Sequence, residues 1–327
     1  MPDRSGALMD GIKSLQGRIG AIARSVLVAI AMSSSVSVAA AQSPDINFRL
    51  LYDVARLANQ AYDGTSEIFG RLSADKATAV TPGTSQVQYV LNFNDARRIQ
   101  VISVRGTDND ANVELDLDTK GVLDRKSGIF MHNGFRTAAR DIYADLKPRL
   151  KPGYTTYLTG HSLGGAVAAI LGIYLTVDGY KVGRIATFGQ PKFTDIAGAR
   201  AYWNLPLLRL IYQNDTVVFL PDTFAGSKRK YAHIGAVVNL LSGPYYVYGS
   251  AAQGMEFSVG SFGRLFGQIS VPDHSMKWYL QGLREKVDGA TEVGFEDRNR
   301  YIIRHRRGSG AGTQPAAKPK YNFNHHN

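Results

Sequence analysis

One stretch of the chain, residues 155–171, decides the fold; it reads TTYLTGHSLGGAVAAIL. Its first five residues are typical of a strand, and residues 166–171 are apolar in the manner of a buried helix. Between them, Gly160 and Gly164 flank Ser162 in the pattern G-x-S-x-G. A serine raised on a sharp strand-to-helix turn needs small residues two positions away on each side, because these come too close together to carry side chains. The stretch therefore predicts a nucleophile, Ser162, although small residues that serve packing alone would give the same pattern.

Strands and helices alternate on both sides of this turn. The hydrophobic patterns predict helices at about 45–64, 134–149, 162–176, 193–203 and 273–285, and strands at 87–93, 99–104, 155–159, 183–188 and 206–213. The first two strands are separated by Asn94-Asp95 and are expected to form a hairpin. Strand–helix alternation with short links is typical of parallel strands that are covered by helices on both faces. We therefore expect an α/β fold with a central, mostly parallel sheet.

The two ends of the chain differ from this body. Residues 1–41 have a basic lead, the apolar run 26–32 and small residues up to Ala41, which predicts a cleaved signal peptide and a secreted or periplasmic protein. Residues 305–327 are rich in Gly, Pro, Ala and Lys and predict a disordered basic tail. The domain between them is expected to span residues 42–304.

Charge and cysteine content exclude several classes of protein. The net charge is +11, but the two ends carry most of it and leave about +2 on the body. A nucleic-acid-binding body would need a basic face of its own, so we expect no nucleic-acid partner. There is no cysteine among the 327 residues, which excludes disulfides, thiolate metal sites and a cysteine nucleophile.

A serine needs a base to take its proton, and histidine is the usual one near neutral pH. His274 is favoured because it stands at the mouth of the last predicted helix, where a loop beyond the carboxyl edge of the sheet would bring it over Ser162. His233 lies in a strand-like run and stays the alternative. His132 precedes a helix and is expected to make a structural hydrogen bond, and His161 is expected to point away from the Ser162 hydroxyl.

The acid that orients the base is expected between the serine and the histidine in the chain. Asp215 follows the predicted strand 206–213 and a turn-forming Asn214, so it would lie at a carboxyl end of the sheet. Asp222, after Pro221, is the weaker alternative.

Two backbone N–H groups are needed for the oxyanion of an acyl-transfer reaction. One is expected from Leu163, the residue after the nucleophile. The segment Val104-Arg105-Gly106-Thr107 ends a buried strand with a glycine and a hydroxyl residue, so Thr107 is the candidate for the second donor. An ordinary turn at the end of a strand would read the same way.

Taken together, these motifs resemble those of the class 3 lipases, the fungal-lipase-like branch of the α/β hydrolases, in a bacterial secreted type. The matching segments, in the family's order within residues 46–285, are VRGT (104–107), HNGF (132–135), GHSLGG (160–165), TFGQP (187–191), NDTV (214–217) and DH (273–274). The resemblance implies an α/β-hydrolase fold, a triad of Ser162, Asp215 and His274, and an oxyanion hole formed by Thr107 and Leu163.

The chain departs from this family at the lid. Residues 108–118 read DNDANVELDLD, with three large apolar residues and no tryptophan. A lid that prefers an oil interface needs exposed apolar area. Strong interfacial activation on long-chain triglycerides is therefore not expected, and shorter acyl esters, monoacylglycerols and phospholipids stay open as substrates.

The sequence thus predicts a serine ester hydrolase, a lipase or esterase that works through an acyl-enzyme on Ser162 without a cofactor or a metal. Its expected partner is a lipid or a small ester, with some contact to a membrane surface. Acyl transfer, amide hydrolysis or phospholipid cleavage on the same residues is one alternative. A lipase-like protein that binds lipid without turnover is another.

Overall fold

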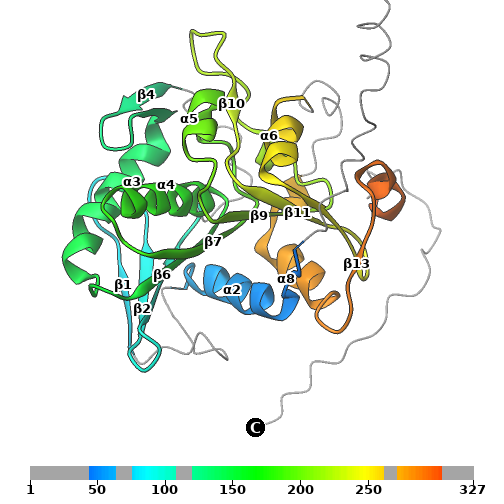
Figure 1. The fold of residues 1–327 in the computed structure, drawn as a ribbon, viewed down its shortest axis with the longest axis horizontal. Coiled ribbons are helices and arrows are strands. Elements are labelled where there is room, and N and C mark those ends of the chain that lie inside the picture. The colour runs from blue at the N-terminus through cyan, green and yellow to red at the C-terminus, as the bar shows by residue number, and fades with distance from the viewer. Residues whose placement is uncertain (1–43, 64–75, 108–119, 261–270, 304–327) are drawn as a thin grey trace, which may run out of the picture. The chain divides into compact units, whose positions relative to one another are not determined.

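A mostly parallel sheet runs through the computed structural model, which describes residues 44–63, 76–107, 120–260 and 271–303 (Figure 1). The predicted signal peptide, the lid segment and the basic tail lie outside these residues. In spatial order the strands are β1 (Lys76–Val80), β2 (Tyr89–Asn94), β3 (Ile99–Val104), β6 (Thr155–His161), β7 (Val182–Phe188), β9 (Leu207–Tyr212), β11 (Ala236–Leu240), β12 (Tyr245–Gly249) and β13 (Thr291–Glu292).

Strand directions agree with the expected fold class. The central strands β3, β6, β7, β9 and β11 pair in parallel. The pairs β1–β2, β2–β3 and β11–β12 are antiparallel, so the predicted hairpin of β2 and β3 is confirmed. A second sheet contains β10 (Tyr231–Ala232), β8 (Thr194–Asp195), β5 (Ile129–His132) and β4 (Gly121–Asp124) in that order. No second sheet was predicted, although the strand-like run 231–235 that contains His233 begins with β10.

Helices cover both faces of the central sheet (Figure 1). On one face lie α3 (Asn133–Leu146) and α4 (Leu163–Val177), whose buried residues share a core with β3, β6 and β7. On the other face lie α2 (Phe48–Gln60) and α8 (Met276–Arg284), which pack on β7, β9 and β11. The remaining α-helices of the described chain are α5 (Ile196–Ala201) and α6 (Ala251–Gly260). None of the described helices has the length and apolar character that crossing a membrane requires.

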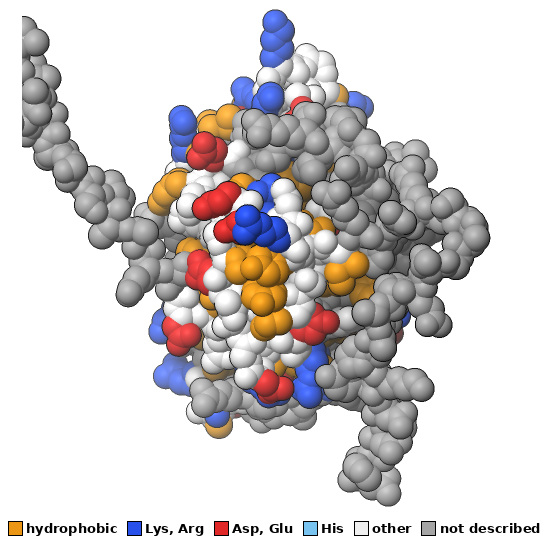
Figure 2. All heavy atoms as spheres, turned by 90° about the vertical axis from the view of Figure 1, so that its right-hand side faces the viewer, with side chains coloured by type: hydrophobic (Ala, Val, Ile, Leu, Met, Phe, Trp, Pro, Cys, Tyr) orange, Lys and Arg blue, Asp and Glu red, His pale blue; other side chains and the backbone are white. Residues whose placement is uncertain are grey.

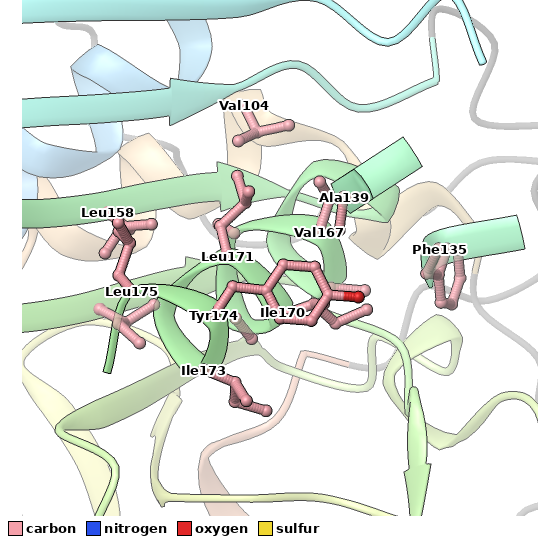
Figure 3. Packing of buried hydrophobic residues seen from close by; sticks show 14 of the residues in the cluster. Val104, Phe135, Ala139, Leu158, Val167, Ile170, Leu171, Ile173, Tyr174 and Leu175 are labelled. Atoms are coloured by element: carbon pink, nitrogen blue, oxygen red, sulfur yellow. The ribbon is translucent and has the colours of Figure 1, made fainter. Parts of the chain in front are cut away.

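Helix α4 is the centre of the larger core. Residues 164–175 are all buried because the helix lies between the sheet and α3. Figure 3 shows Val167 and Leu171 of α4 among side chains of the sheet, such as Val104, and of α3, such as Ala139. A helix that is apolar on all sides is typical of such a buried position. The helix that begins at the G-x-S-x-G turn is therefore held firmly against the sheet.

Three element ends differ from the sequence predictions. The N-cap of α2 is Asn47, whose Oδ1 accepts a hydrogen bond from the Leu50 N–H at 2.9 Å, and not Asp45. The helix predicted at 193–203 is shorter, because Thr194 and Asp195 pair as β8 and the Asp195 side chain caps α5. The last helix begins at Met276 after a 3₁₀ turn, Val271–His274.

Gly164 should be essential for the fold. A Cβ atom there would lie 2.3 Å from the Val104 carbonyl oxygen, and that strand backbone cannot move aside without breaking the sheet. We expect Gly164→Ala to lower the free energy of unfolding by about 3 kcal/mol, the upper end for overpacking. Urea unfolding followed by circular dichroism measures the change. Gly289→Ala is the matched control, since nothing lies within 4 Å of its Cβ position. Equal stability of the two variants would contradict this account of the turn.

Candidate active site

Ser162 occupies a strained turn between β6 and α4. Its backbone has φ 55° and ψ −130°, a region that residues other than glycine rarely adopt. The turn is held by a hydrogen bond from the Ser162 N–H to the Phe188 carbonyl at 2.9 Å. It is also compact, because a Cβ atom on Gly160 would lie 2.4 Å from the Gly164 carbonyl oxygen. This is the close approach that the two flanking glycines predict.

The structure brings Ser162, His274 and Asp215 together. His274 Nε2 lies 2.8 Å from Ser162 Oγ, and His274 Nδ1 lies 2.8 Å from Asp215 Oδ2. A carboxylate only accepts hydrogen bonds, so Nδ1 carries the proton and Nε2 is free to accept from the serine hydroxyl. All three residues are fully buried. They come from the β6–α4 turn, the 3₁₀ turn before α8 and the loop after β9, all beyond the carboxyl ends of parallel strands.

Asp215 is held in its ionised form. Burial raises the pKa of this carboxyl, but the charge of His274 and hydrogen bonds from His274 and Tyr279 outweigh burial, so the pKa lies below its ordinary value. Oδ1 accepts a further hydrogen bond from the Val217 N–H at 3.0 Å. Asp222, the alternative acid, has its Oδ1 3.9 Å from Lys192 Nζ.

The other two candidate bases make structural hydrogen bonds. His233 Nε2 donates to the Val218 carbonyl at 2.7 Å, and burial, together with the nearby charge of Arg209, keeps the pKa of His233 well below its ordinary value. His132 is the N-cap of α3, where its Nδ1 accepts from the Phe135 N–H at 3.3 Å. His132 therefore has the role that its place before a helix predicted.

His161 supports the backbone of His274, a contact that sequence reasoning missed. Its Nε2 lies 2.6 Å from the His274 carbonyl oxygen, which only accepts, so Nε2 carries the proton. Its Nδ1 then accepts from the Tyr62 hydroxyl at 2.8 Å. Burial, and then the neighbouring His274, lower the pKa of His161 to about 3, so the ring is neutral near pH 7. Nothing in the sequence links Tyr62 to a residue 99 positions away.

Tyr279 is a second residue that the sequence analysis missed. Its hydroxyl donates to Asp215 Oδ2 at 2.5 Å from a fully buried position on α8. Burial, and then the charge of Asp215, raise the pKa of Tyr279 well above its ordinary value, so it stays a donor. Its helical spacing from Met276 and Leu283 was a usable signal for burial on α8, but that spacing does not reveal a bond to Asp215.

We expect Tyr279→Phe to lower kcat about tenfold. The carboxylate of Asp215 would lose one of its donors, hold the His274 ring less firmly and attract the imidazolium more strongly. The acid limb of the kcat/KM profile against pH should therefore move to higher pH. A stopped or continuous assay with an aryl ester between pH 5 and 9 measures kcat and the dependence of kcat/KM on pH. An unchanged pH profile together with reduced stability would mean that Tyr279 serves packing only.

The two predicted oxyanion donors lie on either side of Ser162. Leu163 is the first residue of α4, whose N-terminal end carries the positive end of the helix dipole. Thr107 follows β3, and its neighbour Gly106 is so close that a Cβ there would lie 3.3 Å from Ser162 Cβ. The same Cβ would meet the Tyr62 hydroxyl at 2.3 Å, so only glycine fits. Leu163 and the residue before Thr107 thus both lie beside Ser162, and the oxyanion hole itself stays a prediction.

The fold is that of the α/β hydrolases. Among solved structures the chain is similar to the triacylglyceride lipase of Rhizomucor miehei, with a TM-score of 0.56 and 21% identity over 69% of this chain and 91% of that one. It is also similar to lipase II from Rhizopus niveus, with a TM-score of 0.55 and 20% identity over 69% of this chain and 92% of that one. At this identity the likeness concerns the fold, and it confirms the predicted fold class.

Within that class, residues 101–224 match the family described as lipase (class 3). Residues 104–107, 160–165 and 214–217, which carried the resemblance, fall inside this match. Among curated proteins, the chain is 34% identical over 111 residues to the secreted mono- and diacylglycerol lipase 1 of Fusarium solani, covering 32% of this chain and 33% of that protein. It is 37% identical over 73 residues to a lipase of Caenorhabditis elegans, covering 21% of each. The chain thus spans a third or less of the length of these relatives.

The comparisons support the class 3 lipase resemblance but not its bacterial type, since the two relatives come from a fungus and a worm.

Proposed function

We propose that the protein is a serine ester hydrolase that cleaves acyl esters of lipids through an acyl-enzyme on Ser162. One observation carries the proposal: a continuous hydrogen-bonded series of Ser162 Oγ, the His274 ring and the Asp215 carboxylate, with 2.8 Å at each step. A nucleophile, a base and an orienting acid in this order are what acyl transfer to water requires. Residues 101–224, matched by a lipase family, support the same reaction class.

In the proposed mechanism, His274 Nε2 takes the proton of Ser162 as Oγ attacks the ester carbonyl carbon. The negative oxygen of the tetrahedral intermediate receives hydrogen bonds from the Leu163 and Thr107 N–H groups. His274 then gives its proton to the leaving alkoxide, and the C–O bond breaks to leave an acyl group on Oγ. A water molecule, deprotonated by His274, releases the acid by the reverse steps. Asp215 stabilises the imidazolium throughout.

The proposed substrates are partial acylglycerols and shorter acyl esters. The Fusarium solani relative is described as a mono- and diacylglycerol lipase, which supports one or two acyl chains. The acidic residues 108–118 with few apolar side chains argue against a lid that opens on an oil surface. We propose further that the chain acts after export, as its N-terminal sequence and the word "secreted" in that relative's name suggest.

A chain-length series tests the substrate class. The exported protein is assayed with p-nitrophenyl esters of two to sixteen carbons and with mono-, di- and trioleoylglycerol. We expect turnover of mono- and dioleoylglycerol to exceed that of trioleoylglycerol, with no jump in rate when the substrate passes its solubility limit.

A fluorophosphonate probe, which reacts with activated serines, is the direct test of the activity itself. If the probe labels the protein but no ester is hydrolysed, hydrolysis is excluded and acyl transfer to another acceptor is left as the function. If the protein binds lipid but shows neither labelling nor turnover, its function is lipid binding and not catalysis.

A further inference from the structure

Arg209 is a buried cation that the proposed mechanism does not use. It lies in the middle of β9, and its side chain is only 1% exposed. Its neighbours Leu208 and Leu210 face α2 and α8, so Arg209 projects from the opposite face of the sheet. There Nε donates to the Ile234 carbonyl at 3.1 Å, but Nη2 has no hydrogen-bond partner.

The charge of Arg209 is also unbalanced among the described residues. No described carboxylate forms an ion pair with it, and its partner in the adjacent strand β11 is the apolar Val237. Burial alone lowers the pKa of Arg209 to about 9, which leaves the guanidinium charged at neutral pH. Its charge contributes to keeping the nearby buried His233 neutral. A buried cation without a counter-charge carries a large desolvation penalty, and such charges are normally paired.

Helix α6 closes over the free side of the guanidinium. A Cβ atom on Gly254, in the first turn of α6, would lie 2.8 Å from Arg209 Nη2 and 3.0 Å from the Gly235 carbonyl oxygen. The Ser250 N–H donates to the Gln253 side chain at 2.9 Å, so this end of the helix is capped and fixed. The N-terminal end of a helix carries a partial positive charge that adds to that of the guanidinium. The electrostatic environment at Nη2 therefore favours a negative charge.

We propose that Arg209 anchors a buried binding site for a small monovalent anion such as chloride, bounded by β9, β11 and the first turn of α6. The anion accepts the hydrogen bond of Nη2 and neutralises the guanidinium. A water molecule would satisfy the N–H group but leave the charge uncompensated. The site is separate from Ser162 and His274, so its occupancy acts on the stability of the fold and not on the reaction.

Thermal unfolding at constant ionic strength tests the site. The chloride concentration is raised by replacing sodium gluconate with sodium chloride mole for mole, so that the total salt concentration stays constant. We expect Tm to rise by about 3–5 °C for each tenfold increase in chloride above the dissociation constant. Equal Tm in chloride and gluconate would overturn the proposal and leave water as the partner of Nη2.

Variants identify the residue responsible. Arg209→Met should abolish the chloride response, whereas the matched control Arg184→Met, an exposed arginine of β7, should keep it. Arg209→Met could fail to fold, so Val237→Glu is the second variant. It places a carboxylate directly opposite Arg209, and it should raise Tm in gluconate and remove the chloride dependence. A Val237→Glu protein that still responds to chloride as the parent does would contradict the location.

Crystals grown in bromide give a direct view of the occupant. An anomalous peak at hydrogen-bond distance from Arg209 Nη2 is expected for the parent and not for Val237→Glu. Density at this point without anomalous signal would identify water and overturn the proposal.

Discussion

Replacement of Ser162 by alanine is expected to lower kcat for ester hydrolysis by about 10⁴- to 10⁶-fold and to abolish fluorophosphonate labelling. The substitution removes only the hydroxyl group, and the acyl-enzyme cannot form without its oxygen. Stability should not fall, because alanine also fits the closely packed turn and the strain at positive φ is unchanged. The measurement is turnover of p-nitrophenyl butyrate, with a thermal unfolding curve for each variant.

Ser103→Ala is the matched control for Ser162→Ala. Ser103 is a buried serine of β3 whose hydroxyl has no hydrogen-bond partner, so its loss should leave both turnover and labelling near the parent values. Labelling that persists in Ser162→Ala would mean that another residue is the nucleophile.

Replacement of His274 by alanine should lower kcat by about 10⁴- to 10⁶-fold, as much as replacement of Ser162 does. Without the imidazole nothing takes the proton of Ser162, and residues that act as a unit lose function together. The buried Asp215 would also lose the hydrogen bond from His274 Nδ1, so some loss of stability is expected as well.

His233→Ala separates this role from that of a structural histidine. It removes the hydrogen bond to the Val218 carbonyl and should lower Tm, while kcat of the folded protein stays within about tenfold of the parent. Activity that survives in His274→Ala but disappears in His233→Ala would reverse the assignment of the base. Turnover is measured per folded molecule, with circular dichroism at the assay temperature as the check.

Local constraints explain why the centre of the fold could be predicted. Gly160 is required by a contact with the Gly164 carbonyl within a single turn, and such a requirement is visible in a short stretch of sequence, whereas the contact that requires Gly164 is made with the end of β3. The long apolar helix α4 and the parallel strands follow from the period of the hydrophobic residues. Asp215 could be proposed as the acid because a strand of six buried residues ends shortly before it.

Contacts between distant segments explain what could not be predicted. Strand β8 contains two residues, too few for any period to be recognised, and the strand-like run around His233 does not reveal that β10 pairs with β8. Tyr279 and Tyr62 reach the site only when α8 and α2 pack on the same face of the sheet. The unpaired charge of Arg209 likewise depends on the register that sets Val237 opposite to it.

The hydrogen bond between Tyr62 and His161 connects the turn that follows α2 to the candidate active site. A shortened chain that begins after Asp63 would retain every residue named in the mechanism. It would nevertheless lose the hydroxyl that donates to Nδ1 of His161, the residue whose Nε2 donates to the His274 carbonyl. In such a chain the ring of His161 would be held less firmly against the His274 backbone, so we expect a fragment without Tyr62 to turn over esters more slowly than the whole chain.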